Sequence, residues 1–341
     1  MAFLEARDLV VEYATRRGPV RALDEASLTV DAGEVVGVVG ESGSGKSTIG
    51  SALARLLPGN ARISGGDVRV GGRSLLDLDD DALRVLRRDA LGFVFQDPIG
   101  TLDPTARIGR QLAWVLGGKP AERELIPHLE RVRLPDPERT LRAFPHQLSG
   151  GMAQRVSIAL ALARAPQAVI ADEPTASLDA SVRAEILELL VSLTRDAGTA
   201  LMVMSHDLRA VRRFCTRVAV VYGGRVVETA PAQELFDHPL HPYTRALLDA
   251  APGAEAPGER LRPIAGIPPV LHGPFGGCAF VGRCAHAVEA CGVERPTVHT
   301  SDHDVLCHLA PVKEKAESSA EPRIPSAELA LGARSSRKAS R

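Results

Sequence analysis

The sequence contains the run Gly40-Glu41-Ser42-Gly43-Ser44-Gly45-Lys46-Ser47-Thr48. An apolar stretch at 34–40 with the pattern of a strand leads into it, and Ile49, Leu53 and Leu56 follow at helical spacing. A strand that enters a helix through a glycine-rich turn is the setting that a phosphate-binding loop requires. The glycines let backbone N–H groups turn inward, and the helix presents its positive end. We therefore expect Lys46 to reach the outer phosphates of a nucleotide and Ser47 to bind magnesium.

Two adjacent carboxylates follow a second apolar run. Residues 168–171 have the pattern of a buried strand, and Asp172 and Glu173 come directly after it. In phosphoryl transfer, the first acid can hold magnesium through water and the second can orient the water that attacks the γ-phosphate. Two acids at a strand end can also form a solvated turn, but the phosphate-binding loop favours the catalytic interpretation.

The rest of the pattern predicts an α/β fold. Apolar runs that indicate short strands lie at 9–13, 26–30, 65–70, 91–96 and 201–204. Helical patterns cover 181–195 and most of 108–165, with breaks at Gly117, Pro135, Pro145 and Gly150. We expect a largely parallel sheet covered by helices, with a helical subdomain at about 97–165.

Composition excludes several classes of protein. The chain has 41 Lys and Arg against 42 Asp and Glu, so its net charge of −1 argues against a nucleic-acid partner. Its longest apolar runs, such as 35–39 and 218–222, are far shorter than the ~20 residues of a membrane helix. Glu5 and Asp8 stand where a signal peptide would be basic and then apolar, so we expect a cytoplasmic protein, in which disulfides are disfavoured.

The domain boundaries are predicted from composition. A length of 341 residues suggests about two domains. We expect a main domain at 1–250, a small Cys-rich domain at 251–311 that begins with a Pro- and Gly-rich linker, and a disordered tail at 312–341 with a basic end. Cys215 lies outside the Cys-rich part and is most simply a buried small side chain.

A serine and two glycines, Ser149-Gly150-Gly151, open an apolar helix after Leu148. Serine caps many helices, so this feature alone has two explanations. The order of motifs is more specific, since Gln96 follows a strand, Ser177-Leu178-Asp179 follows the two acids, and His206 ends another strand. With the phosphate-binding loop, this order resembles the ATP-binding subunit of ATP-binding cassette (ABC) transporters, over about residues 3–235. The fold that the resemblance implies is a P-loop ATPase sheet with a helical subdomain.

The resemblance also implies residue roles. Tyr13 would stack on adenine, although a tyrosine there can simply be packing, and Gln96 would sense the γ-phosphate and magnesium. Ser149 and Gly151 would contact ATP held by an opposite subunit, and Asp179 would join the two sites. His206 would act at the γ-phosphate, although a histidine at a strand end is often structural. The resemblance assigns nucleotide binding to Tyr13, Gly40, Ser42, Gly43, Ser44, Gly45, Lys46, Ser47, Thr48, Gln96, Ser149, Gly150, Gly151, Asp172 and Asp179, magnesium to Ser47, Gln96 and Asp172, and catalysis to Glu173, His206 and Gln96.

Further segments resemble one branch, the ATPases of bacterial dipeptide and oligopeptide importers. They are residues 95–98, Phe-Gln-Asp-Pro, residues 101–104, Thr-Leu-Asp-Pro, and residues 241–248. The implied partners are a second ATPase subunit, as a heterodimer, two transmembrane permease subunits and an extracytoplasmic substrate-binding protein, with the chain on the inner face of the cell membrane. Related cargoes such as nickel, a glycan or an antibiotic peptide stay open, as does a soluble ABC ATPase outside transport.

Four cysteines follow the linker with the spacing C-x5-C-x6-C-x15-C. They are Cys278, Cys284, Cys291 and Cys307. Four thiolates on a short loop-rich segment can hold a metal centre in place of a hydrophobic core. The resemblance implies a four-iron four-sulfur cluster. Zinc, with His303 or His308 as substitute ligands, and free or packed thiols are the alternatives.

Overall fold

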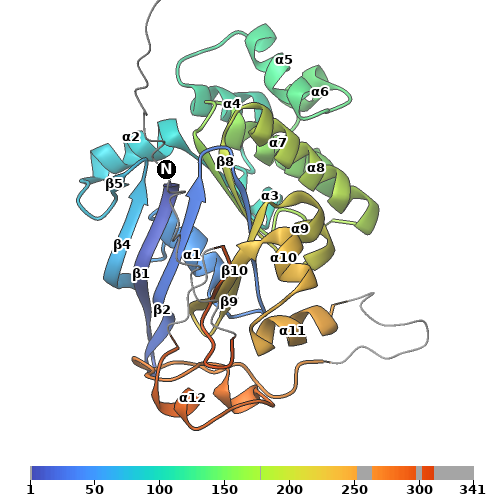
Figure 1. Ribbon diagram of the computed structural model, residues 1–341. Helices are drawn as coiled ribbons and strands as arrows, with labels where there is room; N and C mark the ends of the chain where they lie inside the picture. The colour runs from blue at the N-terminus through green and yellow to red at the C-terminus, as the bar shows by residue number, and fades with distance from the viewer. Residues whose placement is uncertain (1, 177, 252–262, 297–301, 311–341) are drawn as a thin grey trace, which may run out of the picture.

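Two β-sheets form the framework of the chain (Figure 1). The computed structural model describes residues 2–176, 178–251, 263–296 and 302–310. The antiparallel sheet has the strand order β2 (Gly18–Asp31), β1 (Ala2–Thr15), β4 (Ala61–Val70) and β5 (Arg73–Ser74). The larger sheet has the order β11 (Asp304–Val305), β10 (Arg225–Pro231), β9 (Arg217–Tyr222), β3 (Val35–Val39), β8 (Ala200–Met204), β7 (Ala168–Asp172) and β6 (Leu91–Val94).

Strands from β9 to β6 of the larger sheet run parallel, and β10 and β11 are antiparallel additions at one edge. The helices are α1 (Lys46–Leu53), α2 (Asp80–Ala90), α3 (Pro98–Thr101), α4 (Ile108–Leu116), α5 (Glu122–Arg131), α6 (Pro137–Arg142), α7 (Gly150–Leu162), α8 (Ala180–Asp196), α9 (Leu208–Phe214), α10 (Ala232–Asp237), α11 (Pro242–Asp249) and α12 (Ala290–Val293). The predicted α/β class is therefore confirmed. None of the helices in the described ranges combines the length and apolar character needed to span a membrane.

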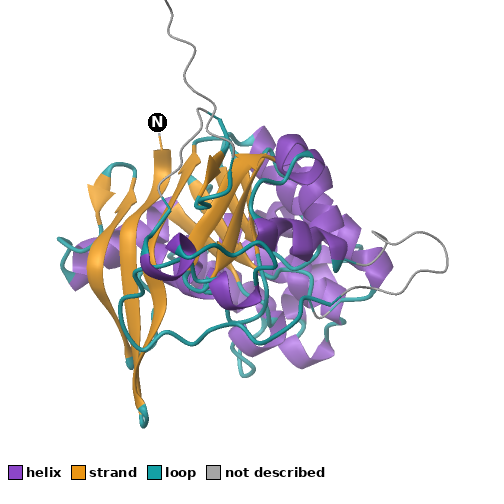
Figure 2. Cartoon of the chain, turned by 60° about the horizontal axis from the view of Figure 1, so that its bottom comes forward, coloured by secondary structure: helices purple, strands orange, loops and turns teal. Residues whose placement is uncertain are grey.

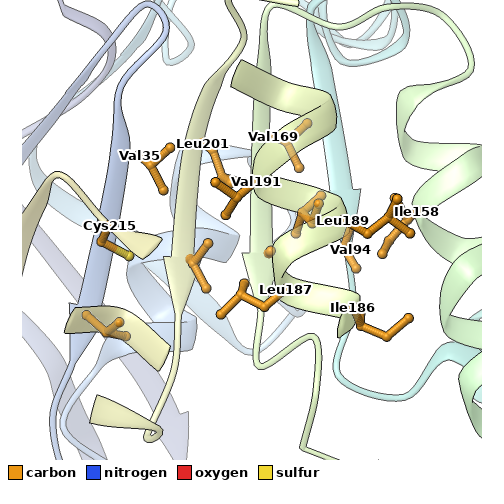
Figure 3. Close-up of a cluster of buried hydrophobic side chains, with 14 of the residues drawn as sticks. Val35, Val94, Ile158, Val169, Ile186, Leu187, Leu189, Val191, Leu201 and Cys215 are labelled. Atoms are coloured by element: carbon orange, nitrogen blue, oxygen red, sulfur yellow. The ribbon is translucent and has the colours of Figure 1, made fainter. Parts of the chain in front are cut away.

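The parallel strands are apolar on both faces because each face packs against a different layer. Successive residues of a strand point to opposite sides. On β3, Val35 belongs to a buried cluster shared with α4, α5, α7 and α8, whereas Val36 belongs to one shared with α1 and the antiparallel sheet. Figure 3 shows the first cluster, where Val169 and Leu201 of the sheet face Ile186 and Leu189 of α8. The sheet is thus fixed from both sides, and its strand ends are rigid positions for side chains.

Residues 97–165 contain α3 to α7, in agreement with the helical pattern of this region. Short loops separate α4, α5 and α6 near Gly117 and Pro135, two of the expected breaks. Figure 1 shows α4, α5, α6 and α7 grouped together at one end of the larger sheet. The exact limits of a helical subdomain stay a prediction.

The C-terminal segment, which we define as residues 263–296 and 302–310, is mostly loop (Figure 2). It contains the short 3-10 helix Val281–Arg283, α12 and β11, and β11 pairs with β10 at the edge of the larger sheet. The backbone N–H of Arg21 in β2 donates to the carbonyl of Leu271 at 2.7 Å. The segment therefore packs on both sheets, and its standing as a separate domain stays a prediction. The predicted disordered tail at 312–341 lies outside the described residues.

Candidate nucleotide site

The phosphate-binding loop connects β3 to α1, as the sequence predicts. Its backbone follows a path that only glycine adopts readily, with φ of 151° at Gly40, 77° at Gly43 and 112° at Gly45. A Cβ atom at Gly40 would lie 2.2 Å from the carbonyl oxygen of Val221 on β9. Gly40 is therefore required both by its conformation and by the close approach of the neighbouring strand.

Lys46, the first residue of α1, folds back over this loop. Its ammonium donates to the carbonyl oxygens of Gly40 at 2.7 Å and Glu41 at 3.0 Å. Burial lowers the pKa of Lys46, while the nearby carboxylates of Glu173 and Asp172 act in the opposite direction. The hydroxyl of Ser44 is buried in the same loop and has no hydrogen-bond partner within the described residues. A buried hydroxyl without a partner and a buried ammonium fit the oxygens of a phosphate.

Ser47, which follows Lys46 in α1, contacts Asp172. The Ser47 hydroxyl donates to Asp172 Oδ1 at 3.0 Å, which joins the start of α1 to the end of β7. Burial raises the pKa of Asp172. A hydroxyl and a carboxylate are oxygen ligands of the kind that magnesium prefers. The two residues therefore fit a magnesium ion beside the phosphates.

Glu173 and His206 form a pair at the ends of β7 and β8. His206 Nδ1 lies 2.8 Å from Glu173 Oε2, and the imidazole is 57% exposed. Glu173 has a φ of 44°, in the left-handed region that residues other than glycine seldom adopt, and its backbone N–H donates to the carbonyl of Met204 at 3.0 Å. Strained backbone of this kind gathers at functional sites. Glu173 lines the same cavity as the loop.

These groups surround one cavity of about 530 Å³. The residues on its wall are Ala22, Gly40, Ser42, Gly43, Ser44, Gly45, Lys46, Ser47, Thr48, Gln96, Glu173 and His206. The cavity therefore brings together the loop of residues 40–48, the predicted Gln96 and the Glu173–His206 pair. Asp172 borders it through Ser47.

Tyr13 lies beside this cavity without lining it. Its hydroxyl is 3.3 Å from Thr48 Oγ1, and its ring packs partly against the apolar cluster under the antiparallel sheet. The position is compatible with contact to a base and with simple packing, so both interpretations of Tyr13 stay open.

Ser149, Gly150, Gly151 and Asp179 lie away from the cavity wall. Ser149 Oγ accepts a hydrogen bond from the N–H of Met152 at 3.3 Å, so it does cap α7. Ser149, Gly150 and Asp179 are exposed, and Asp179 begins α8 without capping it through its side chain. The chain alone therefore places these residues on its surface. Ser177, beside Asp179 in the motif, lies outside the described residues.

The predicted metal centre in the C-terminal segment is wrong. Cys278, Cys284, Cys291 and Cys307 are all described, and no group of three or more His, Cys, Asp or Glu side chains in the described ranges is placed to hold a metal ion. All four are free thiols, and burial raises the pKa of Cys278 and Cys307. The predicted iron-sulfur cluster is therefore replaced by four packed free thiols.

The two histidines near these cysteines, His303 and His308, have other partners. His303 Nε2 lies 2.6 Å from Glu228 Oε1, and His308 Nε2 lies 2.9 Å from the carbonyl oxygen of Glu294. Cys215, by contrast, is buried as expected, and it packs near Gly37 of β3 (Figure 3). Burial raises its pKa to about 12.

Two contacts to the loop come from residues that no motif marks for this role. The backbone N–H of Glu41 donates to the hydroxyl of Tyr243 on α11 at 2.8 Å. Arg283 of the C-terminal segment makes a two-point salt bridge with the Glu41 carboxylate. Tyr243 belongs to the 241–248 stretch, but nothing in its spacing pointed to the loop, because the contact arises only through folding.

Comparison with known proteins agrees with this geometry. Residues 23–176 match the family described as ABC transporter, and residues 227–291 match the family described as oligopeptide/dipeptide transporter, C-terminal region. The chain is 41% identical to the oligopeptide transport ATP-binding protein OppD of Salmonella typhimurium over 317 residues, which cover 91% of this chain and 94% of that protein. It is 40% identical to OppD of Escherichia coli, with 92% and 94% covered.

Solved structures give the same result for the fold. The dimeric ATP-binding cassette MJ0796, bound to ADP and phosphate, is 32% identical and superposes with a TM-score of 0.60 over 67% of this chain and 98% of that one. CbiO1 of Clostridium perfringens, from an ABC transporter complex, gives 28% identity and a TM-score of 0.59 over 70% and 91%. The resemblance seen in the sequence is confirmed. The chain is an ABC ATPase and belongs to the family of oligopeptide and dipeptide transporter ATP-binding proteins.

Proposed function

We propose that this chain binds Mg-ATP in the cavity of residues 40–48 and hydrolyses it to power an importer of dipeptides or oligopeptides. The observation that carries the proposal is the convergence on one cavity of a buried lysine, a Ser47–Asp172 pair and a Glu173–His206 pair. The similarity to OppD proteins supports the choice of a peptide cargo.

The geometry supports the following chemical roles for these residues. The loop N–H groups and Lys46 hold the phosphates, and Ser47, Asp172 and Gln96 would hold magnesium, which neutralises phosphate charge when bound. Glu173 accepts a proton from a water molecule while the oxygen of that water bonds to the γ-phosphorus. The bond between the γ-phosphorus and the oxygen of the leaving ADP breaks in the same step. His206 keeps the Glu173 carboxylate turned toward the γ-phosphate. Tyr13 contacts the base.

The second part of the proposal is a site shared between two ATPase subunits. Ser149, Gly150, Gly151 and Asp179 lie away from the cavity of their own chain, and a helix start with exposed N–H groups is suited to a phosphate. We place them against the ATP of a second ATPase subunit, in a heterodimer. The dimeric state named for MJ0796 supports pairing of cassettes.

We assign the membrane subunits to a surface next to Gln96. A cavity of about 370 Å³ is lined by Phe95, Leu102, Trp114 and Arg88, among others, and Trp114 and Phe95 are 53% and 38% exposed. Exposed aromatic side chains beside an arginine are typical of protein interfaces. Phe95 in this cavity precedes Gln96 in the nucleotide cavity, so a permease helix that docks here would be coupled to Gln96 through Phe95. In this proposal the chain lies on the inner face of the cell membrane, with a substrate-binding protein on the other side.

The test has a biochemical and a cellular arm. The purified chain, assembled with its co-purifying subunits, should release phosphate from Mg-ATP, and Lys46→Ala should remove nucleotide binding and turnover. Cells that lack the chain should lose uptake of labelled peptides, and the wild-type gene, but not the Lys46→Ala form, should restore it. Loss of nickel, glycan or antibiotic-peptide uptake with normal peptide uptake would reassign the cargo, and no co-purifying membrane subunit would refute transport.

A further inference from the structure

Glu41, the second residue of the phosphate-binding loop, is held through all of its polar groups. Its N–H donates to Tyr243 Oη at 2.8 Å, and its carbonyl accepts from Lys46 Nζ at 3.0 Å. Its carboxylate accepts two hydrogen bonds from Arg283, at 2.7 and 3.0 Å. The residue that helps to hold the loop lysine is therefore itself held by α11 and by the C-terminal segment.

Arg283 is a rigid anchor for this contact. Its side chain is only 5% exposed. Beyond Glu41, the guanidinium donates to the carbonyl oxygens of Ala265 at 2.7 Å and Ile264 at 3.1 Å, and to the Tyr222 hydroxyl at 3.2 Å. The planar guanidinium matches a carboxylate with two parallel hydrogen bonds, which lysine cannot reproduce. The position of the guanidinium thus leaves Glu41 little freedom.

Arg283 contacts a cluster of three aromatic side chains through the Tyr222 hydroxyl. The ring centroids of Tyr222 and Tyr243 are 4.4 Å apart, and Phe280 lies 5.2 Å from Tyr222 and 5.4 Å from Tyr243. Tyr222 ends β9, the strand whose Val221 carbonyl limits the space at Gly40. The loop, β9, α11 and the C-terminal segment therefore share one packed cluster, and a shift of the segment is transmitted to the loop.

The charge of Glu41 adds a second effect. ATP brings several negative charges to the loop, and a carboxylate within the loop repels them unless it is neutralised. Arg283 is the cation paired with Glu41, and the pair is mostly withdrawn from solvent, where screening is weak. Removal of the guanidinium would leave the Glu41 carboxylate without this partner, one residue from Gly40 and Ser42 of the cavity wall.

We propose that Arg283 is a positioning residue for ATP: through Glu41 it fixes the phosphate-binding loop and cancels the loop's negative charge, so that the C-terminal segment sets nucleotide affinity. The inference rests on the proposed function, since it concerns the same site. Neither Arg283 nor the Glu41 side chain lines the cavity, so the effect passes through the Glu41 backbone to Lys46 and to the neighbouring loop residues Gly40 and Ser42.

The test is a double-mutant cycle on the full-length chain, with AMP-PNP and magnesium titrated by calorimetry. We expect Arg283→Met to bind about tenfold more weakly, which corresponds to about 1.4 kcal/mol, and Arg283→Lys about threefold more weakly. Glu41→Gln alone should change affinity less than threefold. Glu41→Gln combined with Arg283→Met should return to within about threefold of the wild type, because the repelling carboxylate is gone.

Arg295→Ala is the matched control, because Arg295 is also in the C-terminal segment but pairs with Glu25 of β2, away from the loop. It should bind AMP-PNP like the wild type. The inference is overturned if Arg283→Met binds AMP-PNP with wild-type affinity. It is also overturned if Arg283→Met has a wild-type melting curve but the added Glu41→Gln substitution does not restore its AMP-PNP affinity. If Arg283→Met fails to fold, Arg283→Lys and Glu41→Arg decide: normal affinity in both overturns it. A wild-type chain that binds no AMP-PNP would overturn the proposed function first.

Discussion

Replacement of Glu173 by glutamine isolates its chemical role, because the two side chains have the same shape. The amide oxygen can still accept the hydrogen bond that His206 Nδ1 makes at 2.8 Å, and the backbone of residue 173 keeps its bond to Met204. Only the ability to take a proton from water is lost. A general base contributes about 10²- to 10⁴-fold, so kcat should fall by that factor, or about 2.7 to 5.5 kcal/mol in activation free energy. ATP affinity should be retained.

The assay is steady-state phosphate release by the assembled transporter, together with acid quench of the bound nucleotide. Because a partner ATPase can supply turnover, the quench is decisive: the Glu173→Gln complex should retain about one unhydrolysed ATP per subunit of this chain. Glu188→Gln, an exposed carboxylate on α8 at 3.7 Å from Arg213, is the control and should behave as wild type. Turnover within about threefold of the wild type, with only ADP recovered, would refute the role of Glu173.

Three further predictions concern pairing, loop strain and pH. Ser149→Arg should leave AMP-PNP binding by the isolated chain intact but abolish turnover in the assembled complex; equal specific activity of monomeric and assembled wild-type protein would contradict the shared site. Gly40→Ala should lower the free energy of unfolding in urea by about 3 kcal/mol, because the new Cβ would lie 2.2 Å from the carbonyl oxygen of Val221. Gly43→Ala has open space around the new Cβ and should lower it by only about 1 kcal/mol, and equal losses in the two variants would contradict this prediction. Burial lowers the pKa of His241 to about 4, so between pH 6.5 and 4 the unfolded chain binds a proton on His241 that the folded chain does not. The free energy of unfolding therefore falls by about 3 kcal/mol as pH falls through that window. His241→Asn should flatten this part of the plot of unfolding free energy in urea against pH, and an unchanged slope would contradict the prediction.

Local patterns were sufficient for the phosphate site. A strand, a glycine-rich turn and a helix are all formed by neighbouring residues, so β3, the loop and α1 could be predicted from their order in the chain. Asp172 and Glu173 follow an apolar run, and the carboxyl ends of parallel strands meet at one edge of a sheet, which places both acids beside the loop. The alternation within each parallel strand was less visible, because both faces are buried and no polar residue marks either face.

The C-terminal segment shows where such reasoning fails. Four cysteines on a short loop-rich segment and the family resemblance suggested a metal centre, but the cysteines are packed as free thiols, and their positions along a loop do not determine where the thiol groups point. The Arg283–Glu41 salt bridge could not be predicted either, because 242 positions separate its partners and no motif connects them. Residue order thus specified the loop, the acids and the family, since their contacts are local or tied to strand ends. The anchoring of that loop by a distant arginine and tyrosine depends on how β9, α11 and the segment pack together, and that packing exists only in the folded chain.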